Sequence, residues 1–178
     1  MIHFNSWYHP YTDYVIDNGL MGGVGNAQFD PDGIMTRAML VTVLYRMAGS
    51  PDVSAKTSFA DVPADAYYAD AVAWAKEQGI ALGVTATTFE PEKAVTREEA
   101  ATFLYRYVTA MSGKPEAGDG DLSVFRDADK VQDYAKEAMS WAVGEGLFGG
   151  FPNETLQPAV GLTRAQMAKL LTILDQKP

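Results

Sequence analysis

Three arginines that directly follow a threonine are the residues of this sequence best suited to chemistry. They are Arg37, Arg97 and Arg164, half of the six arginines in the chain. If each threonine caps a helix, the arginine takes the first helical position, where the helix dipole disfavours a cation by roughly 0.3–1 kcal/mol. A guanidinium beside free helix-start N–H groups can bind a carboxylate or phosphate, so the pattern favours an anion site. An ion pair with Asp61, Asp127 or another nearby carboxylate is the structural alternative.

The three Thr-Arg pairs mark an internal repeat with intervals of 60 and 67 residues. With the threonines Thr36, Thr96 and Thr163 as anchors, six further positions align. They are an aromatic 22 residues earlier (Tyr14, Trp74, Trp141), a glycine 17 earlier (Gly19, Gly79, Gly146), a second glycine 13 earlier (Gly23, Gly83, Gly150), an apolar residue 7 earlier (Phe29, Phe89, Leu156), a proline 5 earlier (Pro31, Pro91, Pro158) and a leucine 8 later (Leu44, Leu104, Leu171). Agreement at so many positions indicates three copies of one repeat.

Each repeat reads as helix, loop, helix. We expect the first helix to end near the earlier glycine, which suits the left-handed position past a helix end. The second helix should begin within about two residues of the threonine. Glu99 and Gln166 stand where they complete capping boxes, whereas Met39 leaves Thr36 to cap alone. An apolar stripe at helical spacing follows each cap and is expected to form the core. The sequence thus predicts an all-α fold with repeats over residues 1–50, 51–112 and 113–178.

Composition excludes several classes of protein. The net charge is −9, which is unfavourable for sheathing a nucleic-acid backbone. No run of 18 apolar residues is present, so we expect no membrane insertion. The chain has no cysteine, and His3 and His9 cannot alone make a zinc site, so we expect neither a metal nor another cofactor. Asp30-Pro31-Asp32-Gly33 is an ordinary turn without the ligand series of a calcium loop.

The sequence also lacks the motifs of an enzyme. It contains no Ser-His-Asp or Cys-His set and no glycine-rich phosphate loop, and no single carboxylate among the 23 stands out as a buried acid. We therefore expect no catalysis. The aromatics Tyr14, Trp74 and Trp141 are expected to pack in the core rather than stack on sugars. The second glycine of each repeat, Gly23, Gly83 or Gly150, is expected to serve backbone geometry, with close approach to a ligand as its secondary role.

These landmarks resemble the S-layer homology family. The similarity rests on the openings Phe59-Ala60-Asp61 and Phe125-Arg126-Asp127, the Phe-x-Pro turns and the three Thr-Arg helix starts, and it runs from about Trp7 to Leu174. The resemblance implies a pseudo-threefold spindle with grooves between three prongs. It further implies non-covalent binding of an anionic, often pyruvylated, secondary cell-wall polysaccharide by the motif arginines. The protein would then be extracellular, associated with the cell wall or S-layer, and part of a larger exported protein.

Two alternatives to glycan binding remain: a protein-interaction or surface-assembly scaffold of the same fold, and a small wall-acting enzyme. Alanine in place of a motif arginine should weaken wall binding about tenfold and spare folding, if the arginine is exposed. No signal peptide opens the sequence, so we expect Met1 to begin a trimmed chain. The first repeat also lacks the Phe-x-Asp opening, and we expect residues 1–6 to be poorly ordered or held by another molecule.

Overall fold

The computed structural model describes residues 6–115 and 120–176. Their backbone forms six α-helices and three short 3₁₀-helices, and within these ranges the only β-type pairings are isolated bridges. The α-helices are α1 (His9–Asp17), α2 (Arg37–Met47), α3 (Ala69–Glu77), α4 (Arg97–Ser112), α5 (Lys136–Gly144) and α6 (Arg164–Asp175). The 3₁₀-helices are η1 (Leu122–Val124), η2 (Ala128–Lys130) and η3 (Asp133–Ala135). The predicted all-α class with three repeats is confirmed.

The second helix of each repeat begins where the Thr-Arg pair predicts. Thr36, Thr96 and Thr163 are the N-caps of α2, α4 and α6, and each side chain accepts a hydrogen bond from the N–H three residues on. Glu99 and Gln166 close capping boxes by accepting from the N-cap N–H, and Thr36 caps without such a partner. These local rules therefore fix three helix starts.

The first helix of each repeat ends at the predicted glycine. Gly19, Gly79 and Gly146 have φ values of 68°, 72° and 72°, in the left-handed region that favours glycine. The N–H of the next residue reaches back to a carbonyl of the last turn, as in the bond from Leu20 to the Val15 carbonyl at 2.8 Å. Each ending is thus a Schellman motif with a buried aliphatic residue after the glycine.

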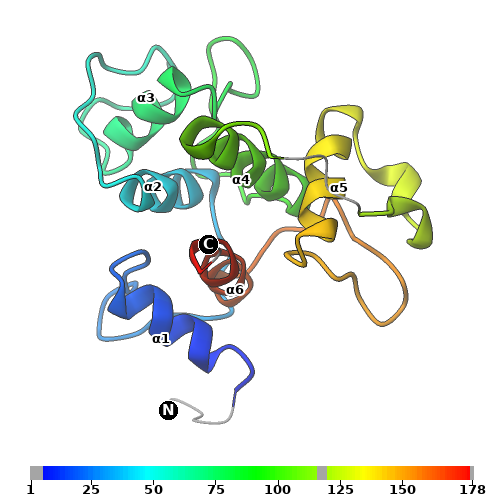
Figure 1. The fold of residues 1–178 in the computed structure, drawn as a ribbon. Coiled ribbons are helices and arrows are strands. Elements are labelled where there is room, and N and C mark those ends of the chain that lie inside the picture. The colour runs from blue at the N-terminus through cyan, green and yellow to red at the C-terminus, as the bar shows by residue number, and fades with distance from the viewer. Residues whose placement is uncertain (1–5, 116–119, 177–178) are drawn as a thin grey trace.

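The helices pair across repeat boundaries. Helix α3 packs on α2, α5 packs on α4, and α1 packs on α6, so the first helix of each repeat lies against the second helix of the preceding one. Figure 1 shows these three pairs, including the blue α1 beside the red α6. The order is cyclic, because the last repeat supplies the partner for the first.

A ring of backbone hydrogen bonds joins the three repeats at the residue before each capping threonine. Met35 donates to the Leu162 carbonyl (2.9 Å), Val95 donates to Met35 (2.9 Å), and Leu162 donates to Val95 (3.1 Å). All three residues are fully buried. The core therefore runs through the centre of the molecule rather than through separate repeats.

Two predictions on the organisation of the chain stay predictions. The helical content confirms the fold class but not the spindle outline, and the boundaries 1–50, 51–112 and 113–178 divide a chain whose repeats share one core. The expectation for residues 1–6 falls, apart from Ser6, outside the described residues.

Candidate functional site

The N–H groups at the three helix starts are already bonded to the neighbouring repeat. Arg37 donates its backbone N–H to the Lys93 carbonyl at 2.9 Å, and Ala38 donates to the Pro91 carbonyl at 2.9 Å. The same two bonds recur at the starts of α4 and α6, with carbonyls of the proline turns of repeats three and one as acceptors. The expectation that free helix-start N–H groups help to bind an anion was therefore wrong. The proline turn of the next repeat packs against each helix start, and its carbonyls accept hydrogen bonds from these N–H groups.

The arginine side chains cross the same boundary. Each Nε donates to a backbone carbonyl of the following repeat, where repeat one follows repeat three. The acceptor is always the apolar residue seven positions before that repeat's capping threonine. The acceptors are Phe89 for Arg37 (2.8 Å), Leu156 for Arg97 (2.6 Å) and Phe29 for Arg164 (2.7 Å). The three arginines are only 4%, 7% and 6% exposed, so the premise that they are exposed was also wrong. Each arginine therefore has a structural role, because its Nε–carbonyl hydrogen bond joins two neighbouring repeats.

Aromatic rings cover the guanidinium groups. Arg37 lies 4.9 Å from the Phe89 ring centroid, and Arg97 lies 4.4 Å from that of Phe148. Arg164 lies 4.7 Å from the Phe29 ring. Cation–π contacts favour the charged state, while burial opposes it and lowers the pKa of Arg97 to about 10, against the attraction of Asp127. Arg97 therefore remains cationic at neutral pH.

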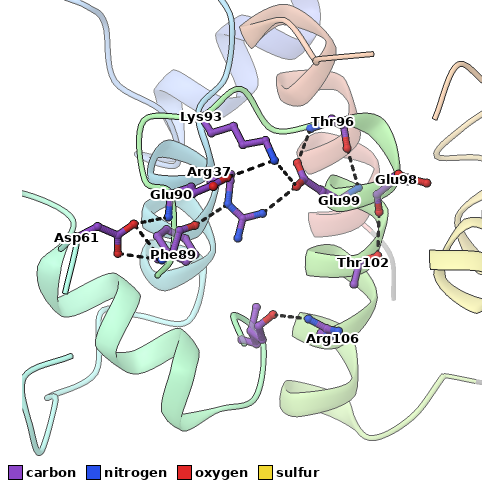
Figure 2. A network of polar contacts seen from close by, with 11 residues as sticks. Arg37, Asp61, Phe89, Glu90, Lys93, Thr96, Glu98, Glu99, Thr102 and Arg106 are labelled. Atoms are coloured by element: carbon purple, nitrogen blue, oxygen red, sulfur yellow. Dashed lines mark hydrogen bonds and ion pairs between the residues drawn. The ribbon is translucent and has the colours of Figure 1, made fainter. Parts of the chain in front are cut away.

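The three arginines differ in how their charge is balanced. Arg37 forms an ion pair with Glu99 at 3.1 Å, and Lys93 lies 3.7 Å from the same carboxylate (Figure 2). The residue that corresponds to Glu99 is Gln166 beside Arg97 and Met39 beside Arg164. Among the described residues, no carboxylate forms an ion pair with Arg97 or Arg164. The ion-pair alternative is therefore confirmed for Arg37, with Glu99 as the carboxylate rather than Asp61 or Asp127.

The terminal nitrogens of Arg97 are available to a ligand. Its Nε is bonded to Leu156, but in the described part of the chain no hydrogen bond engages its Nη atoms. Among the described residues, the Tyr105 hydroxyl is the one fully enclosed side-chain polar atom without a hydrogen-bond partner. Because the Nη atoms of Arg97 also lack a partner, they are not fully enclosed. Arg164 differs, because one Nη donates to the Gly22 carbonyl at 2.6 Å.

Two clefts contain a motif arginine, Arg37 in one and Arg97 in the other, and residues of all three repeats line each cleft. The Arg37 cleft, of about 480 Å³, is lined by Arg37, Leu82, Gly83, Val84, Glu99, Thr102, Phe103, Arg106 and Tyr134. The Arg97 cleft, of about 210 Å³, is lined by Trp7, Arg97, Leu147, Phe148, Gly149, Gly150, Phe151, Leu162, Gln166, Lys169 and Leu170. Both clefts are open to solvent and have a motif arginine on one wall.

Each cleft also contains one exposed aromatic residue, which was not identified from the sequence. This residue comes from the repeat that supplies neither the arginine nor the glycine of that cleft. Trp7 in the Arg97 cleft and Tyr134 in the Arg37 cleft are 57% and 54% exposed. The corresponding residue of repeat two, Tyr67, is 66% exposed, and the charges of Arg46 and Arg164 act on it. All three aromatics stand 29 residues before the capping threonine, so the repeat register already contained this signal.

The electrostatics of Tyr134 reflect the mixed charges of the Arg37 cleft. Burial and the negative charges of Glu98 and Glu99 raise the pKa of Tyr134 to about 12, while Arg37 and Arg106 act in the opposite direction. Arg106 supplies a second cation to this cleft, and Arg46 is its counterpart in repeat one. The counterpart in repeat three is Ile173, while Lys169, one turn earlier, lines the Arg97 cleft.

The predicted glycines divide into two groups. Gly83 and Gly150 line the two arginine clefts with φ values of 86° and 74°, and a β-carbon on either would lie 2.6 Å or 2.4 Å from a ring carbon of Phe59 or Phe125. They are glycines because of backbone conformation and close packing. Gly23 has no positive φ and lines a different cavity, so the structure does not bring it to an arginine cleft.

The helix aromatics have the packing role that was expected of them. Trp74 and Trp141 are 3% and 2% exposed, with their rings beside Tyr45 and Tyr105. Tyr14 is partly buried, and its hydroxyl donates to Asp175 of α6 at 2.8 Å. These aromatics stabilise the helix pairs.

Asp61 and Asp127 hold the turns that bond to Arg37 and Arg97. Asp61 accepts backbone hydrogen bonds from Phe89 and Glu90, and Asp127 accepts them from Leu156 and Gln157. Burial opposes ionisation, but these N–H donors outweigh it and hold the pKa of both carboxyls below the ordinary value. Both carboxylates thus fix the turns whose carbonyls accept from Arg37 and Arg97.

The described residues contain neither a cluster of metal ligands nor a membrane-spanning helix. No group of three or more His, Cys, Asp or Glu residues in residues 6–115 and 120–176 has the geometry of a metal site. Within the same ranges, none of the helices combines the length and hydrophobicity needed to cross a bilayer.

A closed set of three helical repeats, with an arginine from each repeat inserted into the next, forms one module rather than three independent domains. Comparison with known families identifies the repeat: the model of the S-layer homology domain matches residues 5–38, 58–101 and 124–168. The chain belongs to the S-layer homology family.

The similar proteins are surface proteins and enzymes much longer than this chain. The Surface-layer 125 kDa protein of Lysinibacillus sphaericus is 37% identical over 86% of the chain, which covers 13% of that protein. The Cellulosome-anchoring protein of Acetivibrio thermocellus is 28% identical over 86% of the chain and 34% of its own length. The Amylopullulanase of Thermoanaerobacterium thermosulfurigenes is 25% identical over 97% of the chain and 9% of its own length. The chain therefore spans about a third or less of each relative.

Membership of this family makes the chain a cell-surface anchoring module. Its location is extracellular, in association with the cell wall or S-layer.

Proposed function

We propose that this module anchors a larger exported protein by binding an anionic secondary cell-wall polysaccharide, for example a pyruvylated one, without catalysing a reaction. The observation that carries the proposal is the pairing of a guanidinium with an exposed aromatic ring in clefts to which all three repeats contribute. A guanidinium fork matches a carboxylate or phosphate, and an aromatic face suits the apolar face of a sugar ring.

The Arg97 cleft is the best candidate for the primary site. Its guanidinium has unengaged Nη atoms, no carboxylate forms an ion pair with Arg97 in the described residues, and Lys169 and Trp7 line the same cleft. A ligand carboxylate there would meet two cations and one stacking surface. Arg97 is also held by Leu156, so little side-chain entropy is lost on binding.

The Arg37 cleft should bind an anion more weakly, because it carries its own counter-ion. Glu99 already occupies one Nη of Arg37, and an incoming carboxylate would have to compete with it. Arg106 partly offsets this, since it adds a second cation to the same wall. The repeats are therefore equivalent in fold and unequal in ligand binding.

The scaffold alternative is supported by one observation, the burial of the three arginines. Their Nε–carbonyl bonds would stabilise the assembled repeats even if no glycan bound. The two functions differ at Trp7: a scaffold has no need of this exposed ring, whereas a sugar-binding cleft does.

Sedimentation with purified wall sacculi, before and after removal of the secondary polymer, tests the proposal. The chain should sediment only while the polymer is present, and Trp7→Ala should weaken sedimentation without changing the thermal melt. Arg126→Ala is the matched control, because Arg126 is an exposed arginine that pairs with Glu154 outside the residues lining the two arginine clefts. Equal sedimentation with stripped sacculi would reject polysaccharide binding.

A further inference from the structure

One position of the repeat differs in a way that changes the walls of the clefts. Fourteen residues before the capping threonine, repeats one and three have Gly22 and Gly149, whereas repeat two has Leu82. Gly149 lines the Arg97 cleft, and Leu82 lines the Arg37 cleft. The residue at this position therefore helps to set the shape of the cleft that it lines.

Nothing in the described fold requires glycine at position 149. Gly149 lies outside the left-handed region of φ, and a β-carbon built on it would have open space, with no atom of residues 6–115 and 120–176 within 4 Å apart from its chain neighbours. Gly150 is the opposite case, because it has a φ of 74° and its β-carbon would collide with the Phe125 ring. Leu82 also lies outside the left-handed region and is 57% exposed, so this backbone accepts a large side chain.

Glycine at such a position lowers the stability of the chain without a return in packing. Glycine loses more conformational freedom on folding than any other residue, and alanine is the more stable choice wherever the backbone conformation suits it. Gly149 is exposed, so burial does not demand a small residue either. The absence of a side chain at this position therefore points to a ligand rather than to contacts within the chain.

The Arg97 cleft has little room for a side chain at position 149. Its volume is about 210 Å³, below the range of about 300–1,000 Å³ that is usual for small-molecule pockets. The Arg37 cleft has a volume of about 480 Å³ even with Leu82 on its wall. One surplus methylene in a pocket already changes affinity about 10–200-fold, so the four side-chain carbons of a leucine would have a large effect in the smaller cleft.

We propose that Gly149 is a specificity-determining residue of the Arg97 cleft. The missing side chain leaves room for a sugar ring of the anionic polymer to lie against the backbone of this cleft while the acidic group of the sugar reaches Arg97. In repeat two, Leu82 places an aliphatic side chain at the corresponding wall. This inference rests on the proposed function, because it assigns a role within polysaccharide binding.

The probe is the secondary polysaccharide released from purified wall sacculi, titrated into the full chain while tryptophan fluorescence is recorded. Trp7 lines the Arg97 cleft, whereas Trp74 and Trp141 are buried, so a fluorescence change reports on this cleft. Gly149→Leu should weaken binding about tenfold or more, and Gly149→Ala about twofold to tenfold, because the added carbon atoms occupy the room of the ring. The Tm of both variants should equal that of the parent or exceed it slightly, since the backbone of Gly149 suits other residues.

Gly22→Leu is the matched control. Gly22 also lies outside the left-handed region, has open space at its β-carbon and is not among the residues that line the two arginine clefts, so the titration and the Tm should match those of the parent. Equal affinity of the parent and Gly149→Leu would overturn the inference and leave polysaccharide binding intact. A lower Tm for Gly149→Ala would also overturn it, because the glycine would then be structural. Absence of saturable binding by the parent would instead reject the proposed function, and this inference with it.

Discussion

Asp127→Asn is the substitution whose effect the structure predicts in most detail. The Asp127 side chain is buried, at 7% exposure, and it accepts the N–H groups of Leu156 (2.7 Å) and Gln157 (2.8 Å). Asparagine keeps the shape and one neutral acceptor oxygen but loses the charge and the second acceptor. The turn that it holds also presents the Leu156 carbonyl to Arg97, so the change should affect both stability and the Arg97 cleft.

The expected loss follows from those two bonds. A hydrogen bond to a charged group contributes about 1.5–3 kcal/mol, and a neutral one about 0.5–1.5 kcal/mol. Replacing two charged bonds by one neutral bond should therefore lower the free energy of unfolding by about 1.5–5.5 kcal/mol. For a chain of 178 residues, about 2–4 °C per kcal/mol gives a fall in Tm of about 3–22 °C at neutral pH.

The effect should also depend on pH. The pKa of Asp127 is lowered in the folded chain, so its stabilisation is present above the unfolded value of 3.8 and is lost as pH falls through the lower folded value. Thermal melts of the parent and the variant should thus converge as the pH drops below about 4. Asp129→Asn is the matched control, because Asp129 is exposed two residues away. A Tm difference that is absent at pH 7, or constant between pH 7 and pH 3, would refute the reasoning.

Three further variants and one control concern the clefts. Arg97→Ala should weaken sedimentation with wall polymer about tenfold or more and also lower Tm, since it removes both a ligand contact and the bond to the neighbouring repeat; full binding would rule this cleft out as the primary site. Trp7→Ala should weaken sedimentation about twofold to tenfold through lost ring contact, with an unchanged melt, and Arg126→Ala should change neither. Glu99→Gln should increase polymer binding at the Arg37 cleft about twofold to fivefold while keeping the helix cap, and a decrease would mean that this carboxylate takes part in binding.

The sequence predicted the local structure because local rules set it. Three capping threonines and three left-handed glycines fix where helices begin and end, and each rule involves residues within about one turn of the boundary. The repeat register also carried the exposed aromatics Trp7, Tyr67 and Tyr134, which the sequence analysis did not single out. Alignment at 29 residues before each threonine is enough to find them.

The contacts between repeats could not be read from the sequence. Helices α3 and α2 belong to different repeats, and nothing local indicates that a first helix packs on the preceding repeat rather than on its own. For the same reason the helix-start N–H groups were expected to be free: the acceptor for Ala38 is Pro91, 53 residues further along the chain. The identical Thr-Arg pairs also gave no sign that, of the three arginines, only Arg37 forms an ion pair with a carboxylate among residues 6–115 and 120–176.

The pairing of α1 with α6 has a consequence for how the molecule is made. In an open solenoid each new repeat stacks on the last, and repeats can be added or lost at either end. Here the first helix must wait for the last: the Tyr14 hydroxyl bonds to Asp175, 161 residues later. Closing so long a loop makes folding slow and cooperative. A fourth repeat could not be inserted without breaking the α1–α6 pair, and deletion of one repeat would leave a helix without its partner. The cyclic packing of the helices therefore requires three repeats.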